Sequence, residues 1–317
     1  METKCIYVLV STDKDCYYEQ TLCSLYSLRL HNPKVRASVV VDKLTADTLQ
    51  GTRSGLNKYI DELVKIDVPT EFNQMQRSRF LKTNLRQFVE GNYLFIDSDT
   101  VICDSLDEVD RFTFEIGAVA DAHINIGNHR FRDRIHKWGE IGGWSVDDER
   151  PYLNSGIIYV KDTSKTREFY KTWYYHWYEN YKKGLFKDQS SLARTNEEMG
   201  YVMHEMDGIW NCQMIENGLR FMSNAKILHY YGSHPKSPYL LNRKETFKQL
   251  KESGEFSAQL KEYIEHPLTA FSEDCTILSA SDKELVRIGI RRAYLEKMPP
   301  IVLKFYHFIK HHLLNKR

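Results

Sequence analysis

The stretch Asn92-Tyr93-Leu94-Phe95-Ile96-Asp97-Ser98-Asp99 joins an apolar segment directly to two carboxylates. The segment from Tyr93 to Ile96 predicts a short buried strand that ends at the acidic pair. Two carboxylates one residue apart at the end of a strand can both reach one hard divalent cation. An isolated Asp-x-Asp pair is more often a solvated turn, but here Thr100-Val101-Ile102 is apolar again. We therefore predict that Asp97 and Asp99 are metal ligands.

Strand and helix patterns alternate along the N-terminal third of the chain. The apolar run from Ile6 to Val10 predicts a buried strand, and Leu22, Leu25 and Tyr26 recur at the spacing of one helix face. Further strands are predicted at 37–41 and 63–68, and a helix at 77–89. Alternating units of this kind predict an α/β fold with a mostly parallel, doubly wound sheet flanked by helices.

The rest of the chain is expected to complete this domain and to extend it. Strands are predicted at 114–120, 153–160 and 226–230, and helices at 168–182 and from Asp188 onward. Residues 128–148 are charged and contain glycines, so we predict an irregular loop there. From about Asn242 the pattern changes to charged helical segments. We therefore predict one α/β domain over residues 1–240 and a helical C-terminal extension over 241–317.

The composition argues against several classes of protein. The 317 residues carry a formal net charge of +1, whereas nucleic-acid binding usually needs a basic stripe, so we expect no nucleic-acid partner. The 6 cysteines form no CxxC pair and no zinc-finger spacing, which fits a reducing compartment. The apolar run at 6–10 is too short for a signal peptide or a membrane span. We expect a cytoplasmic protein, either soluble or bound peripherally at the inner face of the membrane.

Residues Asn92 to Val101, continued by Asp104-Ser105-Leu106, resemble the signature of family 8 glycosyltransferases. These are retaining enzymes related to bacterial lipopolysaccharide galactosyltransferases and to glycogenin. The resemblance extends in the correct order over roughly residues 5 to 240, as a set of short matches. It implies the GT-A fold, a Rossmann-like, mostly parallel mixed sheet flanked by helices. It also implies a UDP-sugar donor for a catalytic domain at 1–240.

Two short matches concern the nucleotide part of such a donor. Ser11-Thr12-Asp13, with Tyr17 beyond it, is similar to the first nucleotide-binding loop of the family. The resemblance implies that Asp13 contacts the nucleoside and that Tyr17 stacks on the base, with Asp15 as the alternative acid. Ser98, between the two carboxylates, is expected to contact the donor.

An arginine upstream of the acidic pair helps to hold the donor in the family. Arg79 matches it, and Arg77 and Arg86 are the alternatives. A fixed planar cation suits contacts with phosphate oxygens or sugar hydroxyls.

Two further matches concern the donor sugar. Tyr152-Leu153-Asn154-Ser155-Gly156 resembles a Phe-Asn-Ala-Gly segment of the family, and Asp188-Gln189-Ser190 resembles Asp-Gln-Asp. The resemblance implies that Asn154 and Ser155 contact the donor, and that Gly156 lets the backbone approach closely. Asp188 would bind sugar hydroxyls and Gln189 would face the anomeric carbon, which makes Asn154, Asp188 and Gln189 the predicted catalytic residues. Asp188 would also suit a helix N-cap.

The last match resembles the His-x-x-Gly…Lys segment of the family. His229 would be the third protein ligand of the metal, and Gly232 and Lys236 would contact the diphosphate, with His234 as an alternative to Lys236. Two carboxylates and one imidazole suit Mn²⁺ or Mg²⁺, and the imidazole favours Mn²⁺. The pair Trp210-Asn211 also matches the family, and we interpret it as structural.

The chain ends in a segment with no acidic residue, from Ile301 to Arg317. Its basic and aromatic residues predict an amphipathic helix that either lies on an anionic membrane surface or docks on the catalytic domain. A peripheral membrane contact would suit a lipid-linked glycan acceptor.

The matches together predict a hexosyltransferase of lipopolysaccharide or polysaccharide biosynthesis. It would move glucose or galactose from a UDP-sugar to a saccharide or glycoconjugate hydroxyl, with a divalent metal and with retention at the anomeric carbon. Two alternatives remain: an inverting transferase of the same fold, and a catalytically silent relative that binds sugars or membranes.

Overall fold

A computed structural model describes residues 1–214, 216–231, 237–272, 299–302 and 304. The chain divides into two units, Met1–Ser272 and Glu273–Arg317. Most of the second unit, including nearly all of the predicted tail helix, lies outside the described residues, as do Gly232, His234 and Lys236. Among the described residues, no helix combines the length and the apolar character needed to cross a membrane. The predicted division at residue 240 stays a prediction.

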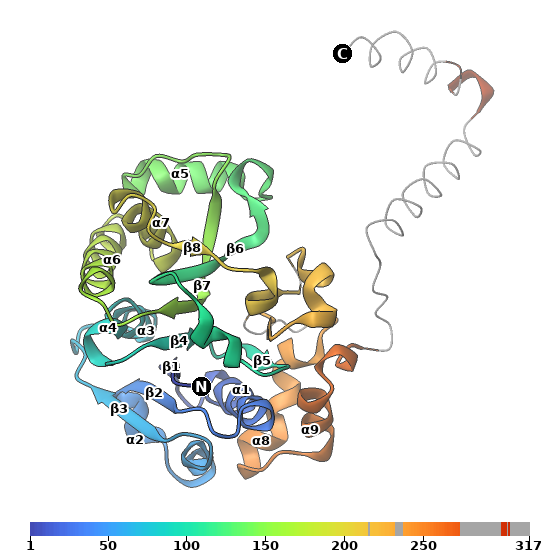
Figure 1. Ribbon diagram of the computed structural model, residues 1–317. Coiled ribbons are helices and arrows are strands. Elements are labelled where there is room, and N and C mark those ends of the chain that lie inside the picture. Colours follow the sequence, from blue (N-terminus) through green and yellow to red (C-terminus); the bar gives the residue numbers. More distant parts are fainter. Residues whose placement is uncertain (215, 232–236, 273–298, 303, 305–317) are drawn as a thin grey trace. The chain divides into compact units, whose positions relative to one another are not determined.

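The first unit is built on a central seven-stranded sheet with the strand order β3-β2-β1-β4-β7-β6-β8 (Figure 1). Strands β3, β2, β1 and β4 are all parallel to one another, whereas β7 runs antiparallel to both β4 and β6. The strands are β1 Lys4–Leu9, β2 Ala37–Asp42, β3 Glu62–Ile66, β4 Tyr93–Ile96, β6 Ile116–Asn125, β7 Pro151–Val160 and β8 His204–Glu205. This mixed, mostly parallel sheet confirms the predicted fold class.

A small second sheet begins directly after the acidic pair. It contains β5 Thr100–Ile102, β9 Cys212–Gln213 and β10 Ile227–His229, with β10 in the middle. Strands β5 and β10 are antiparallel, and the residue opposite His229 is Thr100. This register places His229 beside Asp99, although the two residues are far apart in the sequence.

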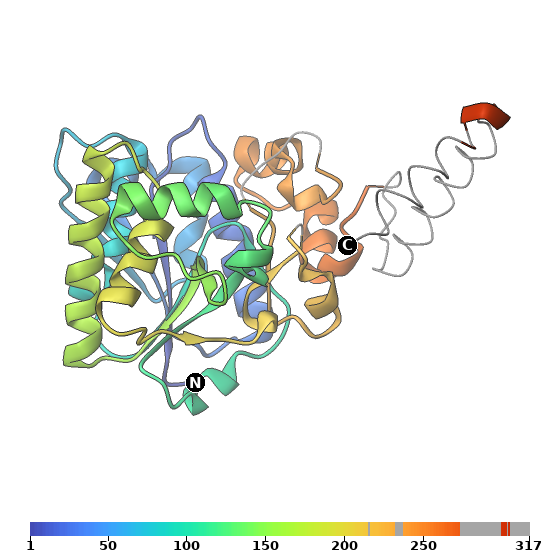
Figure 2. The ribbon, with the colours of Figure 1, turned by 90° about the horizontal axis from the view of Figure 1, so that it is seen from above.

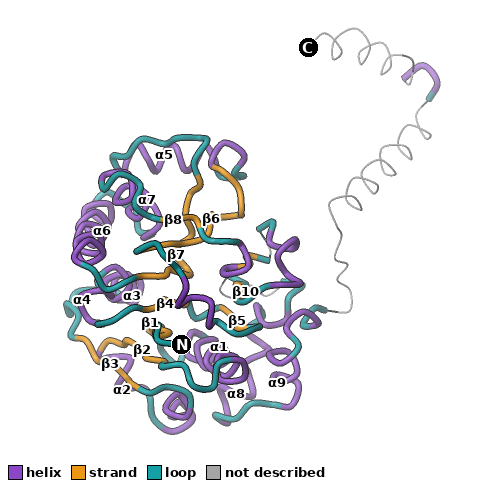
Figure 3. The backbone as a smooth tube through the Cα atoms, in the orientation of Figure 1, coloured by secondary structure: helices purple, strands orange, loops and turns teal. Residues whose placement is uncertain are grey.

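Helices cover both faces of the large sheet (Figures 2 and 3). Helices α1, α8 and α9 lie on one side, and α3, α4 and α6 lie on the other (Figure 1). The helices are α1 Tyr17–His31, α2 Lys43–Thr48, α3 Gln74–Thr83, α4 Leu85–Phe88, α5 Arg132–Gly142, α6 Ser164–Lys182, α7 Asp188–Glu198, α8 Lys248–Ser253 and α9 Ala258–Glu265. Helix α6 begins with a capping box formed by Thr163 and Thr166, and it buries Phe169, Trp173 and Trp177.

The core strands are buried on both faces, as expected for a parallel sheet between two layers of helices. In β4, Leu94 and Ile96 belong to the core on the α1 side, whereas Phe95 belongs to the core on the other side. Successive side chains of a strand alternate between faces. Asp97 therefore emerges on the side of Phe95, where the buried Lys82 of α3 reaches it.

Two predictions for individual elements are wrong. Residues 128–148 contain helix α5, and the helix predicted at 77–89 is interrupted at Asn84. Glycine has a low helix propensity, so the sequence of α5 is not typical of a helix. The structure shows why a glycine is needed there: a Cβ on Gly139 would lie 2.4 Å from the Val146 side chain. Close packing against neighbouring segments outweighs local propensity in α5.

Candidate active site

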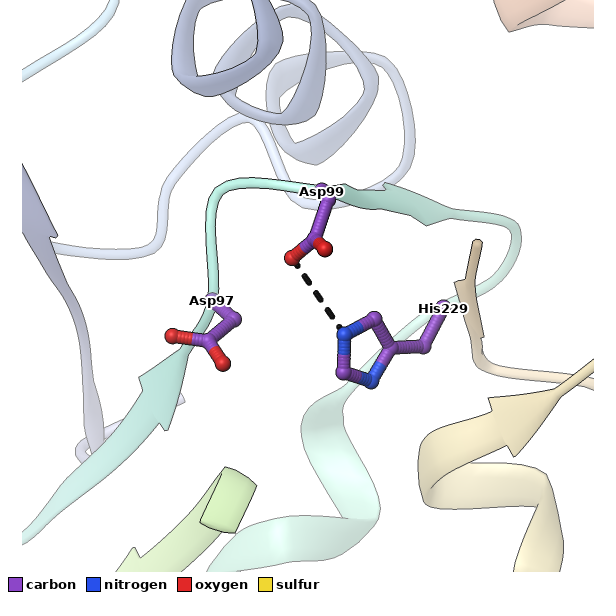
Figure 4. Close-up of side chains that lie close together, drawn as sticks. All are labelled: Asp97, Asp99 and His229. Atoms are coloured by element: carbon purple, nitrogen blue, oxygen red, sulfur yellow. Dashed lines mark ion pairs between the residues drawn. The ribbon is translucent and has the colours of Figure 1, made fainter. Parts of the chain in front are cut away.

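Asp97, Asp99 and His229 form one cluster at the junction of the two sheets (Figure 4). One ligand atom from each of the three lies within 4.8 Å of the other two. The Nε2 atom of His229 lies 3.3 Å from Oδ1 of Asp99. The structure thus brings together the three residues that the sequence predicted as metal ligands.

Two neighbours hold the His229 ring in place. The amide oxygen of Asn211 lies 3.0 Å from Nδ1 of His229 and can only accept a hydrogen bond, so Nδ1 carries a proton and Nε2 faces Asp99. The ring also packs on the backbone of β7, because a Cβ on Gly156 would lie 2.4 Å from Cε1 of His229. The predicted close approach at Gly156 is therefore an approach of His229 to β7. Asn211, interpreted from the sequence as structural, acts directly on the predicted metal ligand.

The charges in this cluster favour a bound cation. Burial raises the pKa of Asp97, and the Asp99 carboxylate adds to this effect, although Lys82 opposes it. Burial alone would lower the pKa of His229, but the Asp99 carboxylate outweighs it and the net shift is upward. The shift at Asp97 arises chiefly from burial and the shift at His229 from the adjacent Asp99 carboxylate, and a bound cation would stabilise both carboxylates. Two carboxylates and an imidazole match the ligand preferences of Mn²⁺, so the residues present fit this ion.

Asp188 lies on the other side of the Lys82 ammonium and has a different environment. The ammonium is 3.3 Å from Oδ2 of Asp188, and Nε of Arg79 is 2.9 Å from Oδ1. The hydroxyl of Ser155 donates a hydrogen bond of 2.9 Å to the same carboxylate. Burial alone would raise the pKa of Asp188, but Lys82 and Arg79 hold it well below its usual range. Asp188 is therefore ionised and acts as a strong hydrogen-bond acceptor at neutral pH.

Asn154 connects the cluster to a carboxylate that the sequence did not indicate. Its amide nitrogen donates 2.7 Å to Asp121 and 3.3 Å to the Tyr231 hydroxyl. Its amide oxygen accepts from the Gly156 backbone and from Asn211. Every polar atom of the Asn154 side chain is thus engaged within the protein. The direct contact between Asn154 and a sugar stays a prediction, whereas its orienting effect on Asp121 is visible.

Asp121 stands where strand β6 bends sharply. The next residues, Ala122 and His123, both have a φ of 55°, in the left-handed region. Such residues need support from their surroundings. Gln213 supplies part of it, because its side chain accepts a hydrogen bond from the Ala122 nitrogen and donates one to the Ala120 oxygen. The only signal in the sequence was a carboxylate directly after the strand predicted at 114–120.

Two adjoining pockets meet at the acidic pair and Arg79. The first pocket includes Tyr17, Ser98 and two side-chain amides in its lining. Its lining residues are Val8, Val10, Tyr17, Asn73, Gln74, Met75, Ser78, Arg79, Asp97, Ser98 and Asp99. The second contains Lys82, Asp121, Asn154, Ser155, Asp188, Gln189 and His229 as well as Arg79, Asp97 and Asp99. A ligand with two parts could place one part in each pocket and its charged middle between them.

The arginine alternatives are separated by their partners. Arg79 lines both pockets and pairs with Asp188. Arg77 instead pairs with Asp42, and the buried Arg86 pairs with Asp162. Of the three arginines, Arg79 is the one placed to contact a ligand.

The two acids of the first loop also differ in placement. Asp15 is tied into the loop, because it accepts hydrogen bonds from Ser11, from the Thr12 backbone and from Gln74. Asp13 is exposed and lines neither pocket. The contact between Asp13 and a nucleoside therefore stays a prediction, while Asp15 shapes the loop.

The model of the family described as "Glycosyl transferase family 8" matches residues 8–236. The chain belongs to glycosyltransferase family 8. No curated protein sequence matches this family 8 chain.

Solved structures of glycosyltransferases share its fold. The galactosyltransferase LgtC in complex with donor and acceptor sugar analogs has a TM-score of 0.55 at 14% identity, covering 82% of this chain and 99% of LgtC. An active-site mutant of LgtC has a TM-score of 0.53 at 14% identity, with coverage of 82% and 99%. Mouse xyloside xylosyltransferase 1 in its apo form has a TM-score of 0.50 at 12% identity, with coverage of 73% and 98%. These likenesses show the GT-A fold, as predicted.

Proposed function

We propose that this family 8 glycosyltransferase moves a hexosyl group, glucose or galactose, from a UDP-sugar to a saccharide or glycoconjugate hydroxyl, with a divalent metal and retention of configuration. The observation that carries the proposal is the Asp97–Asp99–His229 cluster at the junction of two pockets. LgtC, a galactosyltransferase that binds donor and acceptor sugar analogs, adds support through its fold. Retention and the UDP-sugar donor rest on family membership.

In this proposal the first pocket holds the nucleoside and the second holds the sugar. Tyr17 offers a half-exposed ring to the base, and Arg79 reaches the middle of the donor. Asp97, Asp99 and His229 would hold Mn²⁺, which as a Lewis acid stabilises charge on the departing diphosphate. Lys236, which lies outside the described residues, would share this work.

Asp188 accepts hydrogen bonds from sugar hydroxyls without changing its own charge. Lys82 and Arg79 keep it ionised, and they also hold it in position, so the bound sugar meets a fixed acceptor. Gln189 lines the same pocket. In this proposal it would face the anomeric carbon of the bound sugar. Rate enhancement would come from positioning and from prearranged charges.

The decisive test measures release of UDP from a panel of UDP-hexoses, with Mn²⁺ or with excess chelator. We expect turnover with Mn²⁺ and its loss in Asp99→Asn. The exposed Asp107, which lines neither pocket, provides a matched control as Asp107→Asn. Full activity of Asp99→Asn in excess chelator would exclude the metal.

Two further measurements separate the alternatives. NMR of the first product reports its anomeric configuration, and an inverted product would identify an inverting transferase. Titration of UDP with and without Mn²⁺ tests for a silent relative, which would show no metal-dependent binding.

A further inference from the structure

One wall of the sugar pocket is aromatic and basic, and neither the metal cluster nor the donor contacts account for it. It consists of Phe131, Trp138 and the adjacent cations Arg130, Arg134 and Lys187. Phe131 precedes helix α5, Trp138 lies within it, and Lys187 directly precedes α7. Arg130, Phe131, Trp138 and Lys187 all line the pocket that contains Asp188, and none of them lines the nucleoside-side pocket.

The cations of this wall lie over its rings. The guanidinium of Arg130 is 4.5 Å and that of Arg134 is 5.0 Å from the centre of the Phe131 ring. Arg134 and Lys187 lie 6.0 Å and 5.7 Å from the Trp138 ring. Contacts of this kind hold a flexible cation near one place while leaving its hydrogen-bond donors available.

The wall has more positive than negative charge. Arg130 pairs with Glu216. Within the described part of the chain, no carboxylate lies within ion-pair distance of Arg134 or Lys187, and both side chains are exposed. The acids closest in sequence are engaged elsewhere, since Asp133 pairs with Arg132 and Asp188 pairs with Arg79 and Lys82.

We propose that this wall selects an acceptor saccharide that carries an anionic group, either a phosphate or a carboxylate. The inference rests on the proposed transferase function and names its acceptor class. Rings stack on the apolar face of a sugar, as Trp138 and Phe131 could, while guanidinium and ammonium groups bind an oxyanion by charge-assisted hydrogen bonds. The donor diphosphate does not explain these cations, because its place is the junction at Asp97 and Asp99.

The test compares matched ligands in calorimetry with UDP and Mn²⁺ present. Three compounds are titrated into the full-length protein for glucose and again for galactose. They are the neutral methyl glycoside, its 6-phosphate and the methyl glycoside of the corresponding uronic acid. We expect the anionic compounds to bind about tenfold more tightly than the neutral one, since one charge-assisted contact of about 1.4 kcal/mol gives this factor. The phosphate and the uronide compounds distinguish the two anion sources. The preference should weaken as salt is added.

Substitutions in the wall test whether its cations cause the tighter binding of the anionic compounds. In Arg134→Gln and Lys187→Gln the ratio of anionic to neutral affinity should fall toward one, whereas it should persist in Lys137→Gln. Lys137 is an exposed lysine of helix α5. It does not line the pocket as Lys187 does, and it does not lie over the Phe131 and Trp138 rings as Arg134 does. Because the readout is a ratio, a general loss of folded protein does not change it.

Two results would overturn the inference. One is equal affinity for neutral and anionic compounds in the unmodified protein, and the other is an unchanged ratio in both Arg134→Gln and Lys187→Gln. UDP release without any acceptor tests the transferase function separately. If that release occurs while the preference is absent, the acceptor class alone is wrong.

Discussion

Asp97 and Asp188 lie on opposite sides of one ammonium group, and their environments differ. The Lys82 nitrogen is 3.3 Å from each carboxylate. Asp188 has Arg79 as a second cation, whereas Asp97 faces another carboxylate, Asp99. Burial raises the pKa of Asp97 and Asp99 adds to this effect, whereas Lys82 and Arg79 lower the pKa of Asp188 against the effect of burial. On the sugar side, cations of the protein itself balance the Asp188 carboxylate. On the metal side, the carboxylates of Asp97 and Asp99 have too little positive charge nearby.

Replacing the shared cation should have the largest effect. Lys82→Met leaves two carboxylates without their ammonium, and the lysine side chain is only 4% exposed. We expect the free energy of unfolding to fall by about 3–5 kcal/mol, as for other broken buried ion pairs. Urea unfolding measures this loss. The exposed Lys171 supplies a control, because Lys171→Met should change stability by less than about 0.5 kcal/mol.

The second prediction concerns the metal side alone. In Gly156→Ala the new methyl group would overlap the His229 ring, so the ring must move away from Asp99. We expect Mn²⁺ affinity, measured by electron paramagnetic resonance, to fall by about 100-fold, the upper end for changes that displace a ligand's support. Gly55→Ala is the matched control, since a Cβ there would meet nothing closer than 3.5 Å. Unchanged Mn²⁺ affinity in Gly156→Ala would rule out His229 as a ligand.

The same substitution on the two sides should destabilise the protein to different extents. Asp188→Asn removes a carboxylate with two cations and should cost about 2 kcal/mol at pH 7, as for hydrogen bonds to charged groups. Asp97→Asn removes a crowded charge and, without metal, should cost less than about 0.5 kcal/mol. Urea unfolding of both variants tests this contrast, and equal losses would contradict it.

The pH dependence of the Asp188 effect follows from its lowered pKa. Above the unfolded-state pKa, about 3.9, Asp188 contributes its full stabilisation. As the pH falls below this value, the unfolded chain takes up the proton before the folded chain does, so this stabilisation decreases. The stability difference between the unmodified protein and Asp188→Asn should therefore shrink between about pH 4 and pH 3. A constant difference over this range would contradict the assignment.

The smaller of the two predicted effects on Mn²⁺ affinity concerns the hydrogen bond that supports His229. In Asn211→Ala the ring loses the acceptor of its Nδ1 proton, while Gly156 still allows it to pack on β7. We expect Mn²⁺ affinity to fall by about tenfold. The measurement is the same titration as for Gly156→Ala, and the order of the two losses tests the relative weight of packing and hydrogen bonding.

Much of the fold could be predicted because its signals are local. The apolar runs that form β1, β2, β4 and β7 are visible in the sequence, and the alternation of strand and helix patterns indicates the layers. Helix α5 could not be predicted, because its glycines fit between neighbouring segments that are not adjacent in sequence. The wall at Phe131 and Trp138 belongs to the same segment, and no pattern in the sequence singled out these two residues.

The sequence by itself determined the identity of the acidic pair, the sheet that carries it and, through short motifs, the family. Only the tertiary structure decided which polar residues face one another. The β5–β10 register brings His229 to Asp99, and the burial of Lys82 places its ammonium between Asp97 and Asp188. The physical reason is that strand and helix patterns depend on neighbouring residues, whereas charge balance depends on distances between residues far apart in the chain.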